Sequence, residues 1–288
     1  MKKKERSLPL SGAKVFDFSR LLPGPWCAQV LGDMGADVIK VEQPEIGDYS
    51  RFNPPRYREG SVYFNSVNRN KRSIALDLAN DADRDVGMRL LADADIVIES
   101  FRPGVSEKLG IDYRSIVSIN PKVIYCSVSG FGCEGDLSRL PGHDLSIQGI
   151  TGQLGLVQSD SAPPMPNFQA ADYAGATYAV IAILGAYIRR MVSGEGTHLD
   201  IALYDSLMSL SNIALASAMA RLAGHSGTPA LEVWGGNPRY STYRTRDGKA
   251  VTVALLEART WHRFCEFVGR ADLIYDESLA DRHSTQGA

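Results

Sequence analysis

The sequence predicts an α/β fold: a parallel sheet flanked by helices, then long helices and a smaller α+β domain. Three observations carry this prediction. Short apolar runs alternate with segments of helical spacing through the first half of the chain. These runs are almost continuously apolar, which is typical of parallel strands covered on both faces. The second half instead contains two long apolar segments of helical spacing and one hairpin pattern.

The first half begins with a strand–helix–strand pattern. Residues 14–18 (KVFDF) are β-branched and aromatic, residues 26–35 have helical spacing, and residues 36–44 return to a strand that ends at Pro44. This is the size of a βαβ unit. The alternation continues with strands expected at 73–78, 95–100 and 122–132, and helical segments at 81–94 and 105–120. Ligands of such sheets bind beyond the carboxyl ends of the strands.

The second half predicts helices over 171–192 and 203–224, and a hairpin around Asp247-Gly248 followed by a helix over 258–269. The Gly/Pro-rich stretch 225–239 is typical of a domain connector. We therefore expect a large domain over 1–195, a linker helix and connector over 196–232, and a small domain over 233–288.

The composition argues against several classes of protein. The net charge is −2, whereas a nucleic-acid binder should carry a basic excess. No 18 consecutive residues are apolar, and the basic start lacks an apolar segment behind it, so neither a membrane span nor a secretory signal is expected. The four cysteines lack CxxC spacing, which favours a cytoplasmic protein without a metal site. No G-x-G-x-x-G follows the first strand, which argues against NAD or FAD.

Three residues are candidates for acid–base chemistry, and each has a structural alternative. His143 stands at a loop-to-element junction behind Pro141-Gly142 and could simply begin a helix. Asp172 starts an apolar helix and could be a first-turn acid. Glu257 closes a strand and could be an exposed carboxylate. The basic segment 68–73 is either a solvated loop or, with Arg102, a phosphate site.

Several blocks resemble the family III CoA-transferase/α-methylacyl-CoA racemase superfamily (CaiB/BaiF type). They include "NRNKRSIALDL", "ESFRPGVSEKLGIDY", "PGHD", "ADYAGATYAVIAIL" and "GTHLDIALYDSLMS", in family order along the chain. The resemblance implies a Rossmann-like CoA-binding domain and an interlocked homodimer with active sites between domains of different subunits. It also implies an acyl-CoA thioester as substrate, with coenzyme A as part of that substrate and no tightly bound cofactor.

Within this resemblance two chemistries compete. In a transferase, Asp172 would attack the acyl-CoA and form a mixed anhydride, then an enzyme–CoA thioester. In a racemase, His143 and Asp172 would move the α-proton through a thioester enolate, and Glu257 would hold the imidazole. We favour the 2-methylacyl-CoA racemase, because the histidine is present and the small domain lacks the transferases' run of glycines. The chain is shorter than family members, which leaves an inactive CoA-binding paralogue as a further alternative.

The resemblance also implies a set of CoA contacts. They fall on Gln43, Arg72, Ala75, Leu76, Asp77, Leu78, Arg102, Lys108, Gly142, Asp144 and Leu145. Animal racemases carry an arginine where this chain has Gln43, so Lys40 or the nearby basic loop is expected to supply the missing charge.

Overall fold

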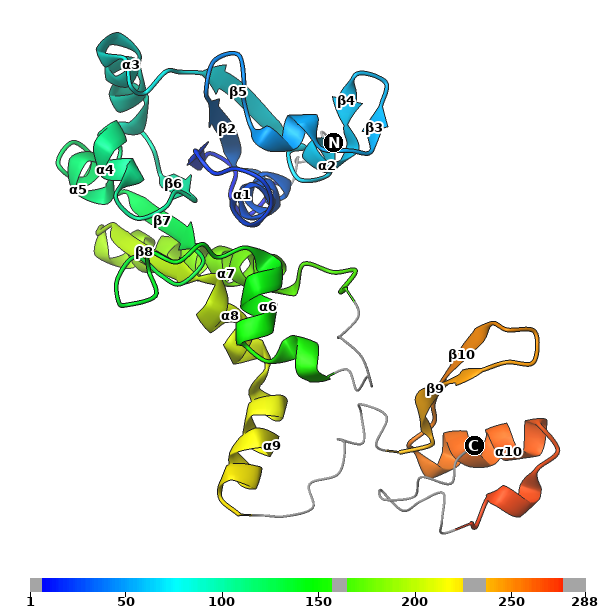
Figure 1. The fold of residues 1–288 in the computed structure, drawn as a ribbon. Helices are drawn as coiled ribbons and strands as arrows, with labels where there is room; N and C mark the ends of the chain where they lie inside the picture. The colour runs from blue at the N-terminus through cyan, green and yellow to red at the C-terminus, as the bar shows by residue number, and fades with distance from the viewer. Residues whose placement is uncertain (1–6, 157–164, 225–236, 277–288) are drawn as a thin grey trace, which may run out of the picture. The chain divides into compact units, whose positions relative to one another are not determined.

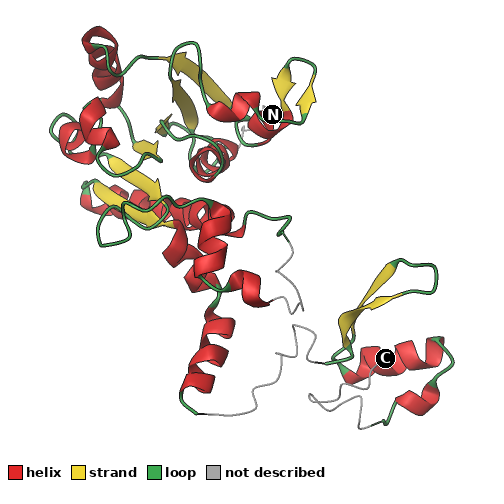
Figure 2. Cartoon of the chain, in the orientation of Figure 1, coloured by secondary structure: helices red, strands yellow, loops and turns green. Residues whose placement is uncertain are grey.

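The computed structural model describes residues 7–156, 165–224 and 237–276, with the side chains of residues 217 and 221 left out (Figures 1 and 2). The chain divides into two compact units, Met1–Ser211 and Asn212–Ala288. The first unit holds the sheet and most of the helices. The second holds the helix Asn212–Leu222, a hairpin and the short helix Ala258–Phe267.

Six parallel strands form the sheet of the first unit, in the order β5-β2-β1-β6-β7-β8 (Figure 1). The strands are β1 (Lys14–Asp17), β2 (Asp37–Glu42), β5 (Lys71–Ala75), β6 (Ile96–Glu99), β7 (Ile124–Ser129) and β8 (Thr197–Ala202). The chain adds β2 and then β5 on one side of β1. It then returns and adds β6 on the other side of β1. The order therefore reverses between β1 and β6, the place where open α/β sheets bind ligands. The predicted α/β fold with a parallel sheet is confirmed.

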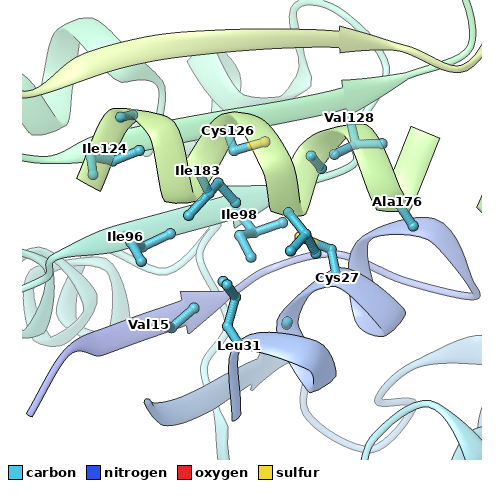
Figure 3. Packing of buried hydrophobic residues seen from close by; sticks show 14 of the residues in the cluster. Val15, Cys27, Leu31, Ile96, Ile98, Ile124, Cys126, Val128, Ala176 and Ile183 are labelled. Carbon is cyan, nitrogen blue, oxygen red and sulfur yellow. The ribbon is translucent and has the colours of Figure 1, made fainter. Parts of the chain in front are cut away.

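Helices cover both faces of the sheet. On one face α1 (Pro23–Asp33), α7 (Ala170–Ser193) and α8 (Leu203–Leu210) share one apolar cluster with the strands. Figure 3 shows its centre, which includes Cys27, Leu31, Ile98, Cys126, Ala176 and Ile183. The opposite face packs against α3 (Asp81–Leu91), α4 (Val105–Leu109) and α5 (Tyr113–Val117). Successive strand side chains point to opposite faces, so Val15 joins the first cluster and Phe16 the second.

Among the described residues, α7 is the helix that is long and apolar enough to span a membrane by length and composition alone. In this structure it is a core helix. Ala174, Ala176, Ala179 and Ile183 on its inner face are buried in the first cluster. Hydrophobic side chains on its other face, including Ile181, Ile188 and Met191, are exposed.

Small elements fill the connection between β2 and β5. A 3₁₀ turn, η1 (Tyr49–Phe52), follows β2, and Asp48 caps it by accepting from the Ser50 amide. A two-residue ladder pairs β3 (Arg56–Tyr57) with β4 (Gly60–Ser61), and α2 (Val62–Ser66) follows. A second 3₁₀ turn, η2 (Gln153–Leu156), lies before α7.

The structure differs from the prediction in three segments. The helix expected over 105–120 is two short helices, α4 and α5, because Gly110 adopts a left-handed conformation with φ 69°. Residues 197–202, expected within a linker, form β8 and pair with β7. The helix expected over 203–224 is broken into α8 and α9 (Asn212–Leu222).

The break between α8 and α9 has a local cause. Ser211 has ψ 17°, and its hydroxyl donates to the Leu207 carbonyl at 2.7 Å. The side chain of Asn212 accepts from the Ile213 amide at 2.9 Å. Side-chain hydrogen bonds of this kind compete with the helical backbone pattern, which explains why apolar periodicity alone overestimated the helix.

The second unit confirms the predicted hairpin and helix. Strands β9 (Tyr240–Arg244) and β10 (Ala250–Ala254) pair antiparallel, and Gly248 takes φ 78° in the connecting turn. The helix α10 (Ala258–Phe267) buries Trp261 and Cys265, and η4 (Ala271–Leu273) follows. Most of the predicted connector, 225–236, lies outside the described residues.

Candidate active site

The loop that carries His143 is packed, backbone against backbone, on the loop that follows β7. A Cβ atom added at Gly142 would lie 2.6 Å from the Cα of Gly130, and one added at Gly130 would lie 2.8 Å from the Cα of Gly142. Side chains do not fit at such a separation, which explains the glycine before His143. The helix α6 (Asp144–Ile150) starts immediately afterwards. His143 is its N-cap residue, with an exposed side chain that makes no capping hydrogen bond.

Asp144 joins the start of α6 to the start of α7. Its Oδ1 accepts from the backbone amides of Ala171 at 2.8 Å and Asp172 at 3.2 Å. Its Oδ2 accepts from the Gln148 side chain at 2.6 Å. The amides in the first turn of a helix lack partners within that helix, and here a carboxylate from another helix supplies one. Asp144 therefore holds Asp172 close to the helix that begins after His143.

The Asp172 carboxyl is half-buried in the first turn of α7. Burial, and then the neighbouring charge of Asp144, raise its pKa from 3.8 to about 7. The next residue, Tyr173, lies edge-on to Trp26 of α1 with 5.6 Å between ring centroids, and stacks on Phe168 at 5.1 Å. Burial raises the pKa of Tyr63 in α2, and the charge of Asp172 adds to that rise. The carboxyl thus lies where α7 packs on α1, within electrostatic range of Tyr63.

The third predicted catalytic residue lies in the second unit. Glu257 is the exposed N-cap of α10, and its backbone carbonyl accepts from the Thr260 hydroxyl at 2.8 Å. Its predicted partnership with His143 stays a prediction. Glu257 does follow a strand, as expected, three residues after β10 ends at Ala254.

Most of the predicted CoA contacts lie beyond the carboxyl ends of strands. Ala75 ends β5, and Leu76 and Leu78 point their side chains into the second core cluster. Asp77 is exposed, and its carboxylate accepts from the Ala79 amide at 3.1 Å. The segment therefore lies at the end of β5, the edge strand of the sheet, and its contact with CoA stays a prediction. Four further predicted contacts have exposed side chains: Gln43, Arg102, Lys108 and Leu145.

Lys40 cannot replace the arginine missing at position 43, so this part of the expectation was wrong, and the alternative of the nearby basic loop stays a prediction. Its side chain is only 2% exposed, with the ammonium 3.0 Å from Asp48 and 3.6 Å from Asp17. It also donates to the Ser19 carbonyl at 2.8 Å. A lysine enclosed in this way neutralises buried carboxylates and is not available to a bound phosphate.

Two cations of the basic segment 68–73, at the start of β5, are also paired with carboxylates. Arg72 lies near the start of β5 and forms a forked pair with Asp37, with nitrogen–oxygen distances of 3.0 and 2.6 Å. The ammonium of Lys71 lies 2.8 Å from Asp17 and is buried. Burial alone would raise the pKa of Asp17, but Lys40 and Lys71 lower it to about 2. The predicted phosphate contact through Arg72 therefore has to compete with a carboxylate already bound.

Sequence reasoning missed two residues at the carboxyl ends of the central strands. Glu99 ends β6, is 4% exposed and accepts from the Phe101 amide at 2.7 Å, so it braces the loop that carries Arg102. Burial raises its pKa to about 7. Arg20 follows β1 and places its guanidinium near the rings of Tyr49 and Phe101. The only sequence signal for Arg20 was its place in "SRLLPGP", a loop expected at a strand end.

Comparison with known proteins confirms the resemblance noted in the sequence. A profile of CoA-transferase family III matches residues 10–287. The chain is 37% identical over 286 residues to succinate–glutarate CoA-transferase of Agrobacterium fabrum, covering 96% of this chain and 70% of that protein. It is 36% identical over 282 residues to succinyl-CoA:mesaconate CoA-transferase of Haloarcula hispanica, covering 93% and 69%. A crystal structure of a CAIB/BAIF family protein from Brucella suis matches with a TM-score of 0.83 and 36% identity, over 97% of this chain and 74% of that one.

Proposed function

Because the chain belongs to CoA-transferase family III, we propose that it transfers CoA between carboxylic acids with Asp172 as the nucleophile. The preference for a racemase drawn from the sequence finds no support among the relatives described above, which are named CoA-transferases. The names of both include dicarboxylic acids or their CoA thioesters. We therefore extend the proposal to dicarboxylic acids as donors and acceptors.

The observation that carries this proposal is the environment of the Asp172 carboxyl. Burial removes water that would stabilise the anion, and Asp144 adds a like charge, so the ionised form is raised in free energy. A pKa of about 7 still leaves a large ionised fraction at neutral pH. A carboxylate poised in this way is suited to attack on a carbonyl carbon.

The proposed cycle balances without an external acid, base or oxidant. A carboxylate oxygen of Asp172 attacks the thioester carbonyl carbon and the carbon–sulfur bond breaks. CoA departs as the thiolate, and an acyl–aspartyl anhydride remains on the enzyme. The thiolate then attacks the aspartyl carbonyl carbon, and the donor acid departs as its carboxylate. The acceptor carboxylate attacks the resulting aspartyl–CoA thioester and reverses both steps. A covalent intermediate of this kind divides one difficult transfer into easier ones.

Within this proposal His143 has a secondary place. The imidazole is exposed and makes no capping hydrogen bond, whereas the following residue, Asp144, carries the contacts that orient Asp172. Proton abstraction at the α-carbon is not part of the transferase cycle. We therefore expect the loss of the imidazole to reduce CoA transfer far less than the loss of Asp172.

We also propose that the active form is a homodimer that binds CoA at the carboxyl edge of the sheet. Exposed apolar side chains along α7, such as Ile181, Ile188 and Met191, support a partner surface. The exposed cations Arg102 and Lys108 support a site for CoA phosphates. Light scattering of the purified chain, with and without CoA, measures the oligomeric state.

The test is incubation with succinyl-CoA and glutarate in deuterated water, read by mass spectrometry. The transferase proposal expects glutaryl-CoA to form and hydroxylamine to trap an adduct on Asp172. Asp172→Ala should abolish both signals, and His143→Ala should retain them. Asp205→Ala is a matched control, because Asp205 is also a first-turn acid but is exposed. Deuterium uptake at the α-carbon of a 2-methylacyl-CoA, lost in His143→Ala and without CoA migration, would instead establish the racemase.

A further inference from the structure

We propose that Arg20 binds an anionic oxygen group of the acyl-CoA or acceptor, either a substrate carboxylate or a CoA phosphate. This inference rests on the proposed function and adds a binding residue to it.

Arg20 lies where the strand order reverses. The loop that carries it leaves the carboxyl end of β1 and follows the end of β6, because Phe18 donates to the Ile98 carbonyl at 2.8 Å. The Arg20 amide then donates to the Ser100 hydroxyl at 3.1 Å. Since β1 and β6 are neighbours from which the chain builds in opposite directions, the crevice expected for a ligand opens at this loop.

The guanidinium is held in place by aromatic residues. Its carbon lies 5.0 Å from the ring centroid of Tyr49 and 5.6 Å from that of Phe101. One of its nitrogens donates to the Tyr49 hydroxyl at 3.1 Å. Contact with rings restrains the long side chain and leaves further N–H groups for a planar, forked acceptor such as a carboxylate or a phosphate.

Within the described part of the chain, two acids near this loop each have another cation. Asp17 is paired with Lys71 at 2.8 Å, and the carboxylate of Asp48 with Lys40 at 3.0 Å. No ion pair with a carboxylate is formed by Arg20 among those residues. The guanidinium therefore carries a positive charge that the surrounding protein leaves uncompensated, which favours an anionic ligand.

Arg51 shows the contrasting case on the same side of the sheet. It too lies over an aromatic ring, 3.8 Å from the centroid of Phe64. Its guanidinium, however, forms a forked pair with Glu42 at 2.7 and 2.6 Å. Arg51 is thus committed to a structural carboxylate, whereas the same arrangement at Arg20 lacks the acid.

The backbone next to Arg20 is also unusual. Leu21 adopts a left-handed conformation with φ 63°, which is costly for a residue with a side chain. The Leu21 amide donates to Asp48 at 3.2 Å, which helps to hold this conformation. Strained backbone of this kind persists where the surrounding structure fixes it, and it is concentrated at functional sites.

The experiment compares Arg20→Gln with the wild-type chain in two arms. Calorimetry measures the affinity for CoA and for 3′-dephospho-CoA, and steady-state kinetics compares succinyl-CoA with butyryl-CoA. A lost charge-assisted hydrogen bond should cost about 10- to 100-fold in affinity or in kcat/KM. The matched control is Arg89→Gln, because Arg89 is exposed on α3 and its guanidinium donates to the Asp85 carbonyl at 3.4 Å.

The two arms identify the source of the anion. A loss confined to succinyl-CoA assigns the guanidinium to the substrate carboxylate. A loss in CoA affinity that is shared by both acyl-CoAs assigns it to a CoA phosphate, and to the 3′-phosphate if dephospho-CoA is unaffected. Wild-type affinities and kinetics in Arg20→Gln would overturn the proposal.

Two safeguards keep the result interpretable. Arg20→Lys keeps the charge and loses the fork, so it should show a smaller loss in the same arm and serves if Arg20→Gln fails to fold. The calorimetric arm needs no turnover. A wild-type chain that binds acyl-CoA but does not transfer CoA therefore refutes the transferase proposal and still tests Arg20, while a wild-type chain that binds neither CoA nor acyl-CoA refutes both.

Discussion

Replacing Asp172 with asparagine should stabilise the protein at alkaline pH and leave its stability nearly unchanged in acid. The reason is the raised pKa of this carboxyl, about 7 in the folded chain against 3.8 for the unperturbed group. Between these values the folded state holds a proton that the unfolded state has released. The free energy of unfolding of the wild-type chain therefore falls as pH rises through this window.

The magnitude follows from the size of the shift. A shift of about three units at about 1.4 kcal/mol each gives an upper value of roughly 4 kcal/mol above pH 7. Asp172 is only half-buried, so water reduces this cost, and we expect Asp172→Asn to gain about 1–3 kcal/mol at about pH 8. At about pH 4 the wild-type carboxyl is protonated in the folded chain, and the gain should nearly vanish.

Urea unfolding followed by circular dichroism at both pH values measures this difference. Asp205→Asn is the control, since it removes an exposed first-turn acid from α8 and should change stability little at either pH. The pKa of Glu99 is also raised to about 7, but Glu99 is present in all three proteins, so its contribution cancels in the comparison. An equal gain at both pH values, or a loss at alkaline pH, would refute the electrostatic argument.

Gly142→Ala should lower stability by about 1–3 kcal/mol and should also lower CoA transfer, because the added Cβ would lie 2.6 Å from backbone. Gly149→Ala in α6 is the control: its added Cβ would have its nearest atom at 3.9 Å, so thermal melts should show that it is tolerated. Asp144→Asn removes the like charge near Asp172, so the pH profile of kcat should move to lower pH. Asp17→Asn should destabilise by about 3–5 kcal/mol at neutral pH by leaving the buried ammonium of Lys71 without its carboxylate partner. In the wild-type chain the pKa of Asp17 is lowered to about 2, so urea melts should show this contribution lost as pH falls from about 4 to 2.

The strands could be predicted from the sequence because their signal is local. Runs such as 95–100 and 122–132 are buried on both faces and therefore almost continuously apolar. The strand β8 escaped because it lies at the edge of the sheet, where "THLDIA" alternates between half-buried and exposed residues. An alternating hexamer between two long helices is easily taken for a connector.

The candidate site could be predicted from the sequence only in part. Sequence position marked His143 and Asp172 as candidates and the family resemblance gave them roles, but the carboxylate that brings their helices together, Asp144, was expected only to contact CoA. The occupied state of Lys40 also depends on contacts between distant segments, which no local pattern reports. Arg20 was missed for the same reason, since its two rings come from loops after different strands.

The sheet's last pair of strands has a consequence for how this chemistry could be altered. The chain leaves β7 at Ser129 and re-enters beside it at Thr197, so the histidine loop, α6 and the aspartate of α7 all belong to a single crossover between adjacent strands. Exchanging that crossover as one cassette would transplant the proposed nucleophile, Asp172, together with the Asp144 contacts that hold its helix. The loops after the other strands, including the one that carries Arg20, would stay unchanged. They would provide the same binding surface for whichever thioester the new cassette acts upon.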